Sequence, residues 1–224
     1  MLAKKVSSAK KLLQEGGLNL LLKHTWTKYF LRPLDSSLGV SAFSFLSENV
    51  VFLTTNDFAY LPIVAQDKDE FLHLIEEAKG VKEVLEIGTF RGGTSFLFYK
   101  LLGANVTTID LKIPIFLRLI LSYKSNGKIR LIRGDSHSKE TLKKVSDRKY
   151  DLLFIDGDHS YESVKKDFEM YSPLVREGGM VAFHDIFSKK GVSTFWNEIK
   201  NRCENKEIVN NAKKEPLGIG VLKI

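Results

Sequence analysis

The residues that most clearly indicate chemistry lie in the run VLEIGTFRGGTS, Val84–Ser95. An apolar, strand-like pattern containing the acid Glu86 leads into a glycine-rich turn and then into a helix-like segment. Such an arrangement usually holds a nucleotide-like ligand. Gly88 can leave a strand through backbone angles that other residues avoid, and Gly92 and Gly93 would let a ligand lie close to the main chain. The turn therefore predicts a binding site for a small ligand with a nucleotide-like part.

The spacing of these glycines narrows the choice of ligand. A dinucleotide fingerprint requires G-x-G-x-x-G, but Phe90 stands at its second glycine position, where a bulky side chain disfavours the close approach of a pyrophosphate. The run reads instead as E-x-G-x-x-x-G-G. This form resembles the cofactor loop of class I S-adenosylmethionine-dependent methyltransferases, in which the acid and the turn hold the methionine end of the cofactor.

Four further strand-like runs follow at regular intervals, and each has an aspartate at or near its end. Their acids are, in chain order, Asp110, Asp135, Asp156 and Asp185. The carboxyl ends of the strands in a doubly wound parallel sheet border one crevice, so these acids would converge on it. A single aspartate in such a place more often caps the next helix, but four strands in series favour a common site.

The elements around these runs predict an α/β fold. Residues 67–79 are expected to form a helix with its apolar side chains on one face, and a second helix is expected after the last of the four runs. Two closing strands, near residues 207–210 and 218–224, resemble the antiparallel pair that completes a class I methyltransferase sheet. We therefore predict a doubly wound, mostly parallel seven-stranded sheet of Rossmann-like methyltransferase type over residues 67–224, preceded by a helical N-terminal extension and connector over residues 1–66.

Length and composition agree with one compact catalytic domain. The chain has 224 residues, 43% of them hydrophobic, which is enough to bury a substantial core. Cys203 is the single cysteine, so neither a disulfide within the chain nor a cysteine-based zinc site is expected. The longest apolar run near the N-terminus, Leu20–Leu22, is too short for a secretory signal or a membrane span. A reducing, cytoplasmic location is the expectation.

The net charge of +7 is concentrated at the N-terminus. Residues 1–33 carry seven basic side chains against Glu15 alone, which leaves the predicted catalytic domain nearly neutral and argues against a nucleic-acid partner. An apolar stripe with helical spacing runs through the same segment: Leu18, Leu21, Leu22, Trp26, Tyr29 and Phe30. Such a helix is expected to pack on its own domain or in a homo-oligomer, with weak contact to an anionic membrane surface as the alternative.

The segment FIDGDHSY, Phe154–Tyr161, resembles the metal-dependent small-molecule O-methyltransferases. The likeness is greatest to those that act on macrolide sugars and to the related cephalosporin-hydroxylase-like group. In that group, the first Asp binds a divalent metal and the His three residues later is the general base. The resemblance therefore implies these roles for Asp156 and His159, and the role of a further metal ligand for Asp185. Catechol-type relatives place a lysine base at the same offset as His159.

Two positions depart from these families. Sugar-modifying relatives have an acid just before the later metal-binding Asp, where this chain has His184, and catechol-type enzymes have Asn just after it, where this chain has Ile186. His184 could complete the ligand shell, although an imidazole suits manganese, iron or zinc better than magnesium. The expected cofactors are S-adenosylmethionine and a divalent metal, Mg²⁺ or Mn²⁺. The other histidines, His24, His73 and His137, carry no motif and are given structural or surface roles.

The rest of the cofactor site is predicted from the same motifs. Asp110 is expected to bind the ribose hydroxyls, because an acid at the end of this strand is the usual partner of a vicinal diol. Asp135 and Ser136 resemble positions that face adenine. Thr94 and Ser95 could meet the carboxylate of the cofactor or could simply begin a helix. The predicted cofactor-binding set is Glu86, Gly88, Thr89, Gly92, Thr94, Ser95, Asp110, Asp135 and Ser136.

These features predict an enzyme that moves a methyl group from S-adenosylmethionine to a hydroxyl of a small molecule or glycan. An ordinary hydroxyl is barely ionised at neutral pH, so a metal ion would lower its proton affinity while His159 accepts the proton. Amine-directed nucleic-acid or protein methyltransferases commonly show an N-P-P-Y-like tetrapeptide where this chain has DGDH, residues 156–159. A nucleotide-sugar or NAD-binding oxidoreductase and a non-catalytic scaffold of the same fold remain as alternatives.

Overall fold

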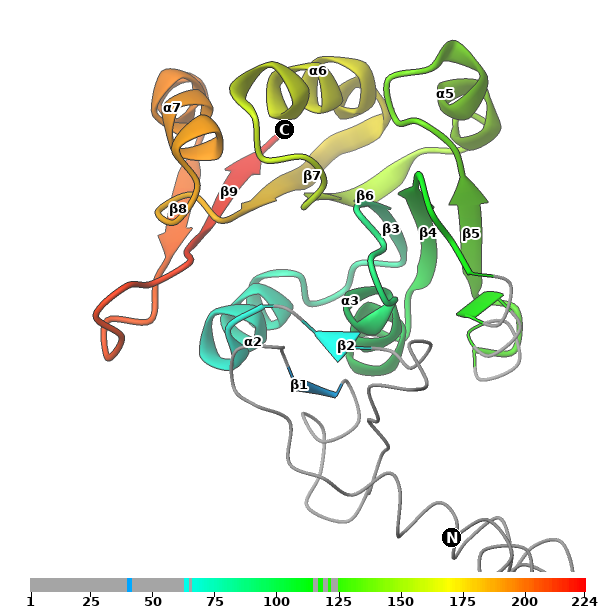
Figure 1. Cartoon of the computed structure of the whole chain (residues 1–224), viewed down its shortest axis with the longest axis horizontal. Coiled ribbons are helices and arrows are strands. Elements are labelled where there is room, and N and C mark those ends of the chain that lie inside the picture. The colour runs from blue at the N-terminus through cyan, green and yellow to red at the C-terminus, as the bar shows by residue number, and fades with distance from the viewer. Residues whose placement is uncertain (1–39, 42–62, 65, 115–116, 119–120, 122–124) are drawn as a thin grey trace, which may run out of the picture.

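The computed structural model describes residues 40–41, 63–64, 66–114, 117–118, 121 and 125–224 (Figure 1). The amphipathic helix expected in the N-terminal extension lies outside these residues. Its packing, its part in a homo-oligomer and its contact with a membrane surface therefore stay predictions, as does the boundary between residues 66 and 67. Within the described part of the chain, no helix has the length and apolar character that a membrane crossing requires.

Seven strands of the described chain form the central sheet (Figure 1). They are β3 (Glu83–Ile87), β4 (Asn105–Asp110), β5 (Ile129–Arg133), β6 (Tyr150–Ile155), β7 (Val175–His184), β8 (Asn205–Ile208) and β9 (Ile219–Lys223). Their order is β5-β4-β3-β6-β7-β9-β8. The first five in this order pair in parallel, and β9 runs antiparallel to β7 and β8. This arrangement confirms the predicted mostly parallel, seven-stranded methyltransferase sheet.

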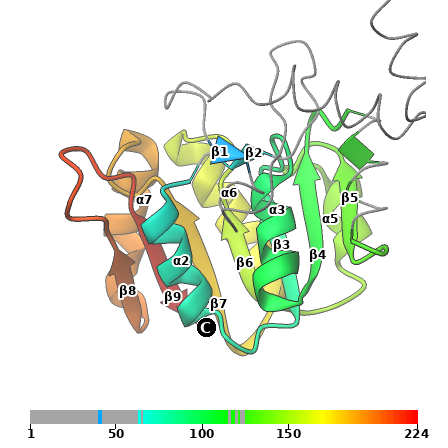
Figure 2. The same cartoon turned by 90° about the horizontal axis from the view of Figure 1, so that it is seen from below.

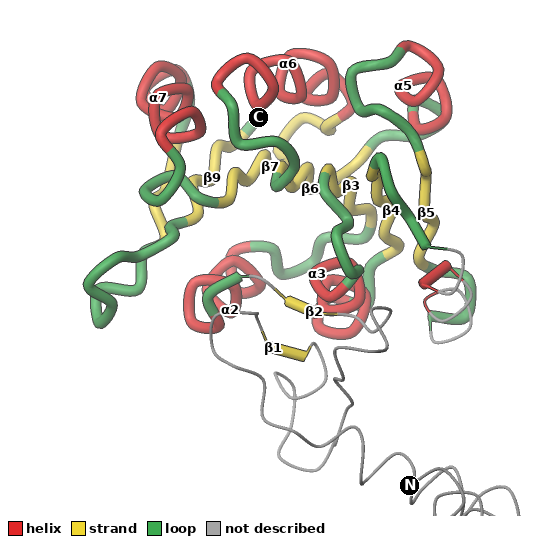
Figure 3. The backbone as a smooth tube through the Cα atoms, in the orientation of Figure 1, coloured by secondary structure: helices red, strands yellow, loops and turns green. Residues whose placement is uncertain are grey.

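Helices cover both faces of the sheet, which explains why the central strands β3 and β6 are buried along most of their length (Figure 3). One face carries α2 (Lys68–Glu77), α3 (Gly93–Leu97) and the π-helical turn η2 (Phe98–Leu102). The other face carries α5 (Lys139–Val145), α6 (Tyr161–Tyr171) and α7 (Lys190–Ile199), with the short 3-10 turns η3 (Ser172–Leu174) and η4 (Lys200–Arg202) after α6 and α7. Figure 2 shows α2 and α3 side by side across their face.

Each face of the sheet has its own apolar core, built largely on aromatic contacts. On the side of α2 and α3, the ring centroid of Phe98 lies 5.2 Å from that of Phe71 and 5.4 Å from that of Phe154. On the opposite side, Phe183 of β7 packs 5.9 Å from Trp196 of α7. All five rings are fully buried, and their tilted or edge-on geometry is favourable for aromatic pairs. The two cores hold the strands, and so the loops at their ends, in fixed register.

The predicted helix over residues 67–79 is confirmed, with its start explained by a cap. Asp67 is the N-cap of α2, and its Oδ1 accepts hydrogen bonds from the backbone amides of Asp69 (2.9 Å) and Glu70 (3.1 Å). The chain enters this helix from a short antiparallel pair, β1 (Val40–Ser41) with β2 (Ile63–Val64). The strand β2 contacts α3, so the described pair lies on the side of the sheet that carries α2 and α3.

The end of β3 is in backbone contact with the end of β6. Gly88 follows β3 with φ of +99°, and a Cβ atom at this position would lie 2.0 Å from the carbonyl oxygen of Asp156. The amide of Asp156 in turn donates to the carbonyl of Ile87 (2.8 Å). The requirement for glycine at position 88 thus has two causes, the left-handed backbone and the close approach of the backbone of Asp156. Only glycine lets the loops after β3 and β6 meet in this way.

We expect Gly88→Ala to destabilise the fold far more than Gly103→Ala. Both glycines have positive φ, but a Cβ atom at Gly103 would meet nothing within 4 Å. Gly103→Ala should therefore cost only the backbone penalty, about 1 kcal/mol, whereas Gly88→Ala adds a clash with backbone and should cost about 3 kcal/mol or more. Urea unfolding of both variants measures the difference, and equal losses would show that the Gly88–Asp156 approach is not the constraint described.

Candidate active site

A cavity of about 760 Å³ opens at the carboxyl ends of the parallel strands. Each strand from β3 to β7 contributes to its wall through the loop that follows it or through its last residue. The predicted site residues on this wall are Gly88, Asp110, Asp135, Ser136, Asp156, His159, His184 and Asp185. The four aspartates at the strand ends therefore share one cavity, as the crevice argument predicted.

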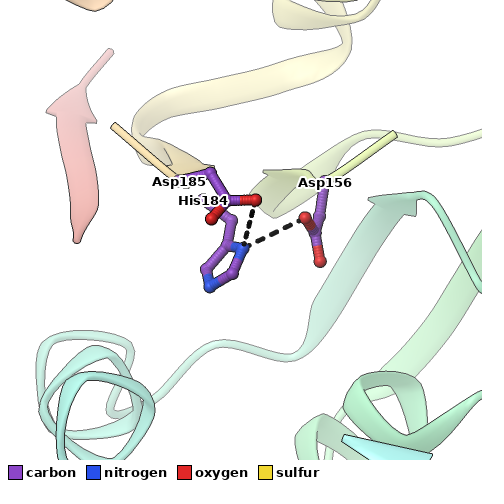
Figure 4. Close-up of side chains that lie close together, drawn as sticks. All are labelled: Asp156, His184 and Asp185. Atoms are coloured by element: carbon purple, nitrogen blue, oxygen red, sulfur yellow. Dashed lines mark hydrogen bonds and ion pairs between the residues drawn. The ribbon is translucent and has the colours of Figure 1, made fainter. Parts of the chain in front are cut away.

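Two carboxylates and two imidazoles meet at the β6 and β7 side of the cavity. Nδ1 of His184 lies 3.1 Å from Oδ1 of Asp156 and 3.4 Å from Oδ2 of Asp185. Nε2 of His159 lies 3.1 Å from the same Asp185 oxygen and 3.7 Å from Oδ1 of Asp156. Figure 4 shows the His184 ring with Nδ1 turned toward the carboxylates of Asp156 and Asp185. The predicted base and the predicted metal ligands thus form one cluster.

Mutual attraction within this cluster shifts every member toward its charged form. Burial alone would raise the pKa of Asp156, but the charge of His184, the ion pair with His159 and the hydrogen bond with His184 hold it below its usual range. The ion pairs with Asp156 and then with Asp185 raise the pKa of His159 to about 9. Burial would lower the pKa of His184, but Asp156 and Asp185 raise it to about 10. The two carboxylates and the two imidazoles therefore stabilise one another's charges in this part of the cavity.

The donor set fits a divalent cation. One ligand atom each from Asp156, His184 and Asp185 lie within 4.8 Å of one another, close enough to share an ion. Nε2 of His184 is buried and makes no hydrogen bond within the described structure. Two carboxylate oxygens with one imidazole nitrogen suit manganese, iron or zinc at least as well as magnesium. The structure therefore brings together all three predicted metal ligands, and metal binding itself stays a proposal.

Asp185, a predicted metal ligand, has a strained backbone conformation. Asp185 has φ of +64° and Phe90, in the loop after β3, has φ of +46°, and both residues line the cavity. Non-glycine residues in this conformation are uncommon and cluster at functional sites. Asp185 is held there by a hydrogen bond from the hydroxyl of Ser188 and by its contact with His159. The fold thus accepts local strain in order to aim this carboxylate.

Asp110 lies on the opposite side of the cavity with its carboxylate held by backbone amides. Its Oδ2 accepts from the amide of Phe90 (2.8 Å), and its Oδ1 accepts from the amide of Lys112 (2.9 Å). Each carboxylate oxygen has a second lone pair, so both can still accept from a ligand. This geometry agrees with the predicted role of Asp110 as the partner of a vicinal diol.

Five residues of the predicted cofactor set lie behind the cavity wall instead of on it: Glu86, Thr89, Gly92, Thr94 and Ser95. The Thr89 and Thr108 hydroxyls hydrogen-bond at 2.6 Å, and the Ser95 hydroxyl donates to Glu86. The space in front of Gly92 is filled by protein, because a Cβ atom there would lie 2.5 Å from the side chain of Leu121. The room expected there for a ligand is therefore used for packing, and direct cofactor contact by these residues stays a prediction.

Glu86 is a buried carboxyl group in the middle of the sheet. It is fully inaccessible to solvent, and burial raises its pKa to about 8 despite hydrogen bonds from Ser95 and Thr108. The charges of Asp156 and Asp110 add to this rise. At neutral pH the group is therefore largely protonated, and it can donate a hydrogen bond as well as accept one.

Glu86→Gln is expected to change how stability depends on pH. Since the folded-state pKa of Glu86 is raised from 4.5 to about 8, the wild-type chain holds an extra proton when folded between these values, and its stability falls as pH rises through them. Glutamine removes this dependence. From pH 6 to pH 9, the free energy of unfolding of Glu86→Gln should rise relative to that of wild type by up to about 3 kcal/mol. Urea unfolding of both proteins at each pH measures this difference. A difference that stays constant with pH would contradict a buried, protonated Glu86.

The structure adds residues to the site that carried no sequence motif. The lack of a motif around His137 predicted a structural or surface role, but this residue lines the cavity, with Nε2 3.2 Å from Oδ1 of Asp167 on α6. Burial raises the pKa of Asp167 to about 6. Tyr171 donates to the backbone carbonyl of Ser136 (2.6 Å). One sequence signal could have indicated Asp167, the partner of His137. It is a charged residue on the buried face of α6, between the apolar Val164 and Tyr171.

Comparison with known proteins agrees with this geometry. Residues 85–186, just under half of the chain, match the family model described as a methyltransferase domain. The chain is 31% identical over 116 residues to protein R132 of Acanthamoeba polyphaga mimivirus, covering 45% of this chain and 50% of that protein. It is 38% identical over 63 residues to protein y4gI of Sinorhizobium fredii, covering 27% of this chain and 7% of that protein. The chain thus spans half or less of these curated relatives.

Solved structures give the same fold over most of the chain. The O-methyltransferase from Bacillus cereus in complex with SAH superposes with a TM-score of 0.59 at 18% identity, covering 90% of this chain and 96% of that one. The O-methyltransferase TomG from Streptomyces achromogenes in complex with SAM gives 0.58 at 17% identity, covering 90% and 94%. Identities this low establish the fold alone.

The family model matched by residues 85–186, together with the fold, makes this chain similar to the class I S-adenosylmethionine-dependent methyltransferases. The predicted resemblance to this class is thereby confirmed.

Proposed function

We propose that this protein transfers a methyl group from S-adenosylmethionine to a hydroxyl oxygen of a small molecule or glycan. The observation that carries the proposal is the single cavity that has Asp110 on one side and the cluster of Asp156, His159, His184 and Asp185 on the other. A diol-binding acid and a deprotonating cluster within one cavity are what an in-line transfer between a bound donor and a hydroxyl requires.

Asp110 would hold the ribose of the donor through its free lone pairs, and the loops after β5 and β6 would enclose the adenine. The transferable methyl group would then lie between Asp110 and the cluster. Asp156, Asp185 and His184 would hold a divalent cation, whose charge would lower the proton affinity of the acceptor hydroxyl. With both carboxylates used in this way, their attraction for the His159 proton would weaken, and Nε2 of His159 would accept the proton of the hydroxyl.

The choice of oxygen as the acceptor atom rests on the residues after β6. The sequence DGDH, 156–159, supplies a carboxylate and an imidazole to the cavity, which suits a hydroxyl that must lose a proton. The O-methyltransferase structures that share the fold support the same choice. A sugar hydroxyl is favoured by the resemblance of this segment to macrolide-sugar enzymes. Methylation of nitrogen in nucleic acid or protein is the competing function.

Calorimetry with S-adenosylhomocysteine and with NAD tests the cofactor. We expect micromolar binding of S-adenosylhomocysteine and no binding of NAD, because Phe90 occupies the position where a pyrophosphate needs glycine. Asp110→Asn should weaken binding about 10- to 100-fold by removing a charge-assisted hydrogen bond, while Asp147→Asn, at the exposed opposite end of the sheet, should leave it unchanged. Binding of NAD without S-adenosylhomocysteine would instead support the oxidoreductase alternative.

Substitution of the cluster tests the chemistry. With labelled S-adenosylmethionine, Mg²⁺ or Mn²⁺, and a panel of glycans and small hydroxyl compounds, His159→Ala should lower turnover about 100- to 10,000-fold, the range for loss of a general base. Asp156→Ala should lower it at least as much. Both variants should still bind S-adenosylhomocysteine. His73→Ala removes an imidazole outside this cavity and should keep full turnover. Unchanged turnover in His159→Ala and Asp156→Ala would remove the cluster from the mechanism.

A further inference from the structure

Gln66 joins Asp156 of the proposed metal site to the start of α3. It lies just before the α2 cap and is only 7% exposed. Its Nε2 donates to Oδ2 of Asp156 (2.7 Å), and its Oε1 accepts from the hydroxyl of Thr94 in α3 (2.6 Å). Two hydrogen bonds in series, from Thr94 to Gln66 and from Gln66 to Asp156, thus connect three segments that are far apart in the sequence.

The orientation of the Gln66 side-chain amide follows from the chemistry of its two partners. An ionised carboxylate can only accept hydrogen bonds, so the NH₂ group of Gln66 must face Asp156. The amide oxygen then faces Thr94, whose hydroxyl must act as the donor. The Gln66 amide is therefore held at both ends, and its alternative orientation would place two acceptors against each other.

The two oxygens of Asp156 consequently have different surroundings. Oδ2 is engaged by Gln66, on the side of α2 and α3. Oδ1 faces His184 at 3.1 Å and His159 at 3.7 Å, within the cluster. The terminal torsion of an aspartate is soft, so without a partner on Oδ2 the carboxylate could rotate and present both oxygens to the cluster. Gln66 opposes this rotation.

We propose that Gln66 is a positioning residue that makes Asp156 offer one oxygen, Oδ1, to the divalent cation, and that Thr94 fixes the Gln66 amide for this purpose. This inference rests on the metal site of the proposed function. A one-oxygen contact from Asp156 leaves more of the coordination shell open to the acceptor hydroxyl than a two-oxygen contact does. Hydrogen bonds to metal-binding carboxylates generally fix their orientation, and losing one typically lowers metal affinity about 10- to 100-fold.

Calorimetric titration of the full chain with Mn²⁺ tests this role. Gln66→Met replaces the amide with an apolar side chain of similar length and should weaken Mn²⁺ binding about 10- to 100-fold. Its affinity for S-adenosylhomocysteine, measured without metal, should change less than about threefold, because Gln66 does not line the cavity. Thr94→Val keeps the Gln66 amide but frees its orientation, and it should give a smaller loss of Mn²⁺ affinity, about 3- to 10-fold.

Asn105→Ala is the matched control. Its side-chain amide also donates to a carboxylate, Oε1 of Glu83 (2.6 Å), but at the opposite end of the strands. This variant should bind Mn²⁺ as wild type does. If Gln66→Met folds and binds Mn²⁺ with wild-type affinity, the inference is overturned while the proposed function stands. If Gln66→Met does not fold, wild-type Mn²⁺ affinity in Thr94→Val overturns it instead. If wild type binds S-adenosylhomocysteine but no Mn²⁺, the metal site fails and the role of Gln66 fails with it.

Discussion

The close backbone approach between Gly88 and Asp156 is the constraint on which the site depends. The parallel pairing of β3 with β4 and β6 continues past the strand ends, since Gly88 donates to the carbonyl of Ile109 (2.9 Å) and Asp156 donates to that of Ile87 (2.8 Å). These bonds bring the turn after β3 against Asp156, the first residue of the loop after β6 that is proposed to bind a metal. A side chain at Gly88 would separate them. The proposed donor site and the proposed acceptor site are therefore adjacent because three strand ends are locked together.

Electrostatics then decides how so many acids can share one cavity. Asp156 and Asp185 stay ionised because His159 and His184 lie against them, and Asp110 is stabilised by two backbone amides. Glu86, which has no such partner and is fully buried, is raised toward its neutral form instead. The two sides of the cavity thus differ in kind. One side carries a carboxylate suited to a diol, and the other carries two carboxylates paired with two imidazoles, of which Asp156, His184 and Asp185 could hold a cation.

Much of this arrangement was predictable from the sequence because it depends on local patterns. Apolar runs ending in aspartates predicted the parallel strands and their shared crevice, and the resemblance carried by FIDGDHSY, with His184 and Asp185, predicted the residues that form the candidate metal site. Contacts between distant segments were not predictable. Gln66 and Asp156 are 90 positions apart, and nothing in the composition of either segment indicates that they meet. The same holds for His137 with Asp167, and for Leu121, which fills the space in front of Gly92.

The central claim is that one cavity holds the methyl donor beside a metal-activated hydroxyl. A crystal structure of the chain with S-adenosylhomocysteine and Mn²⁺ tests it directly, because manganese can be located by its anomalous scattering. The account predicts the ribose against Asp110 and a single manganese peak between Asp156 and Asp185, with one Asp156 oxygen as its ligand. S-adenosylhomocysteine bound away from Asp110, or manganese bound away from these two aspartates, would contradict it.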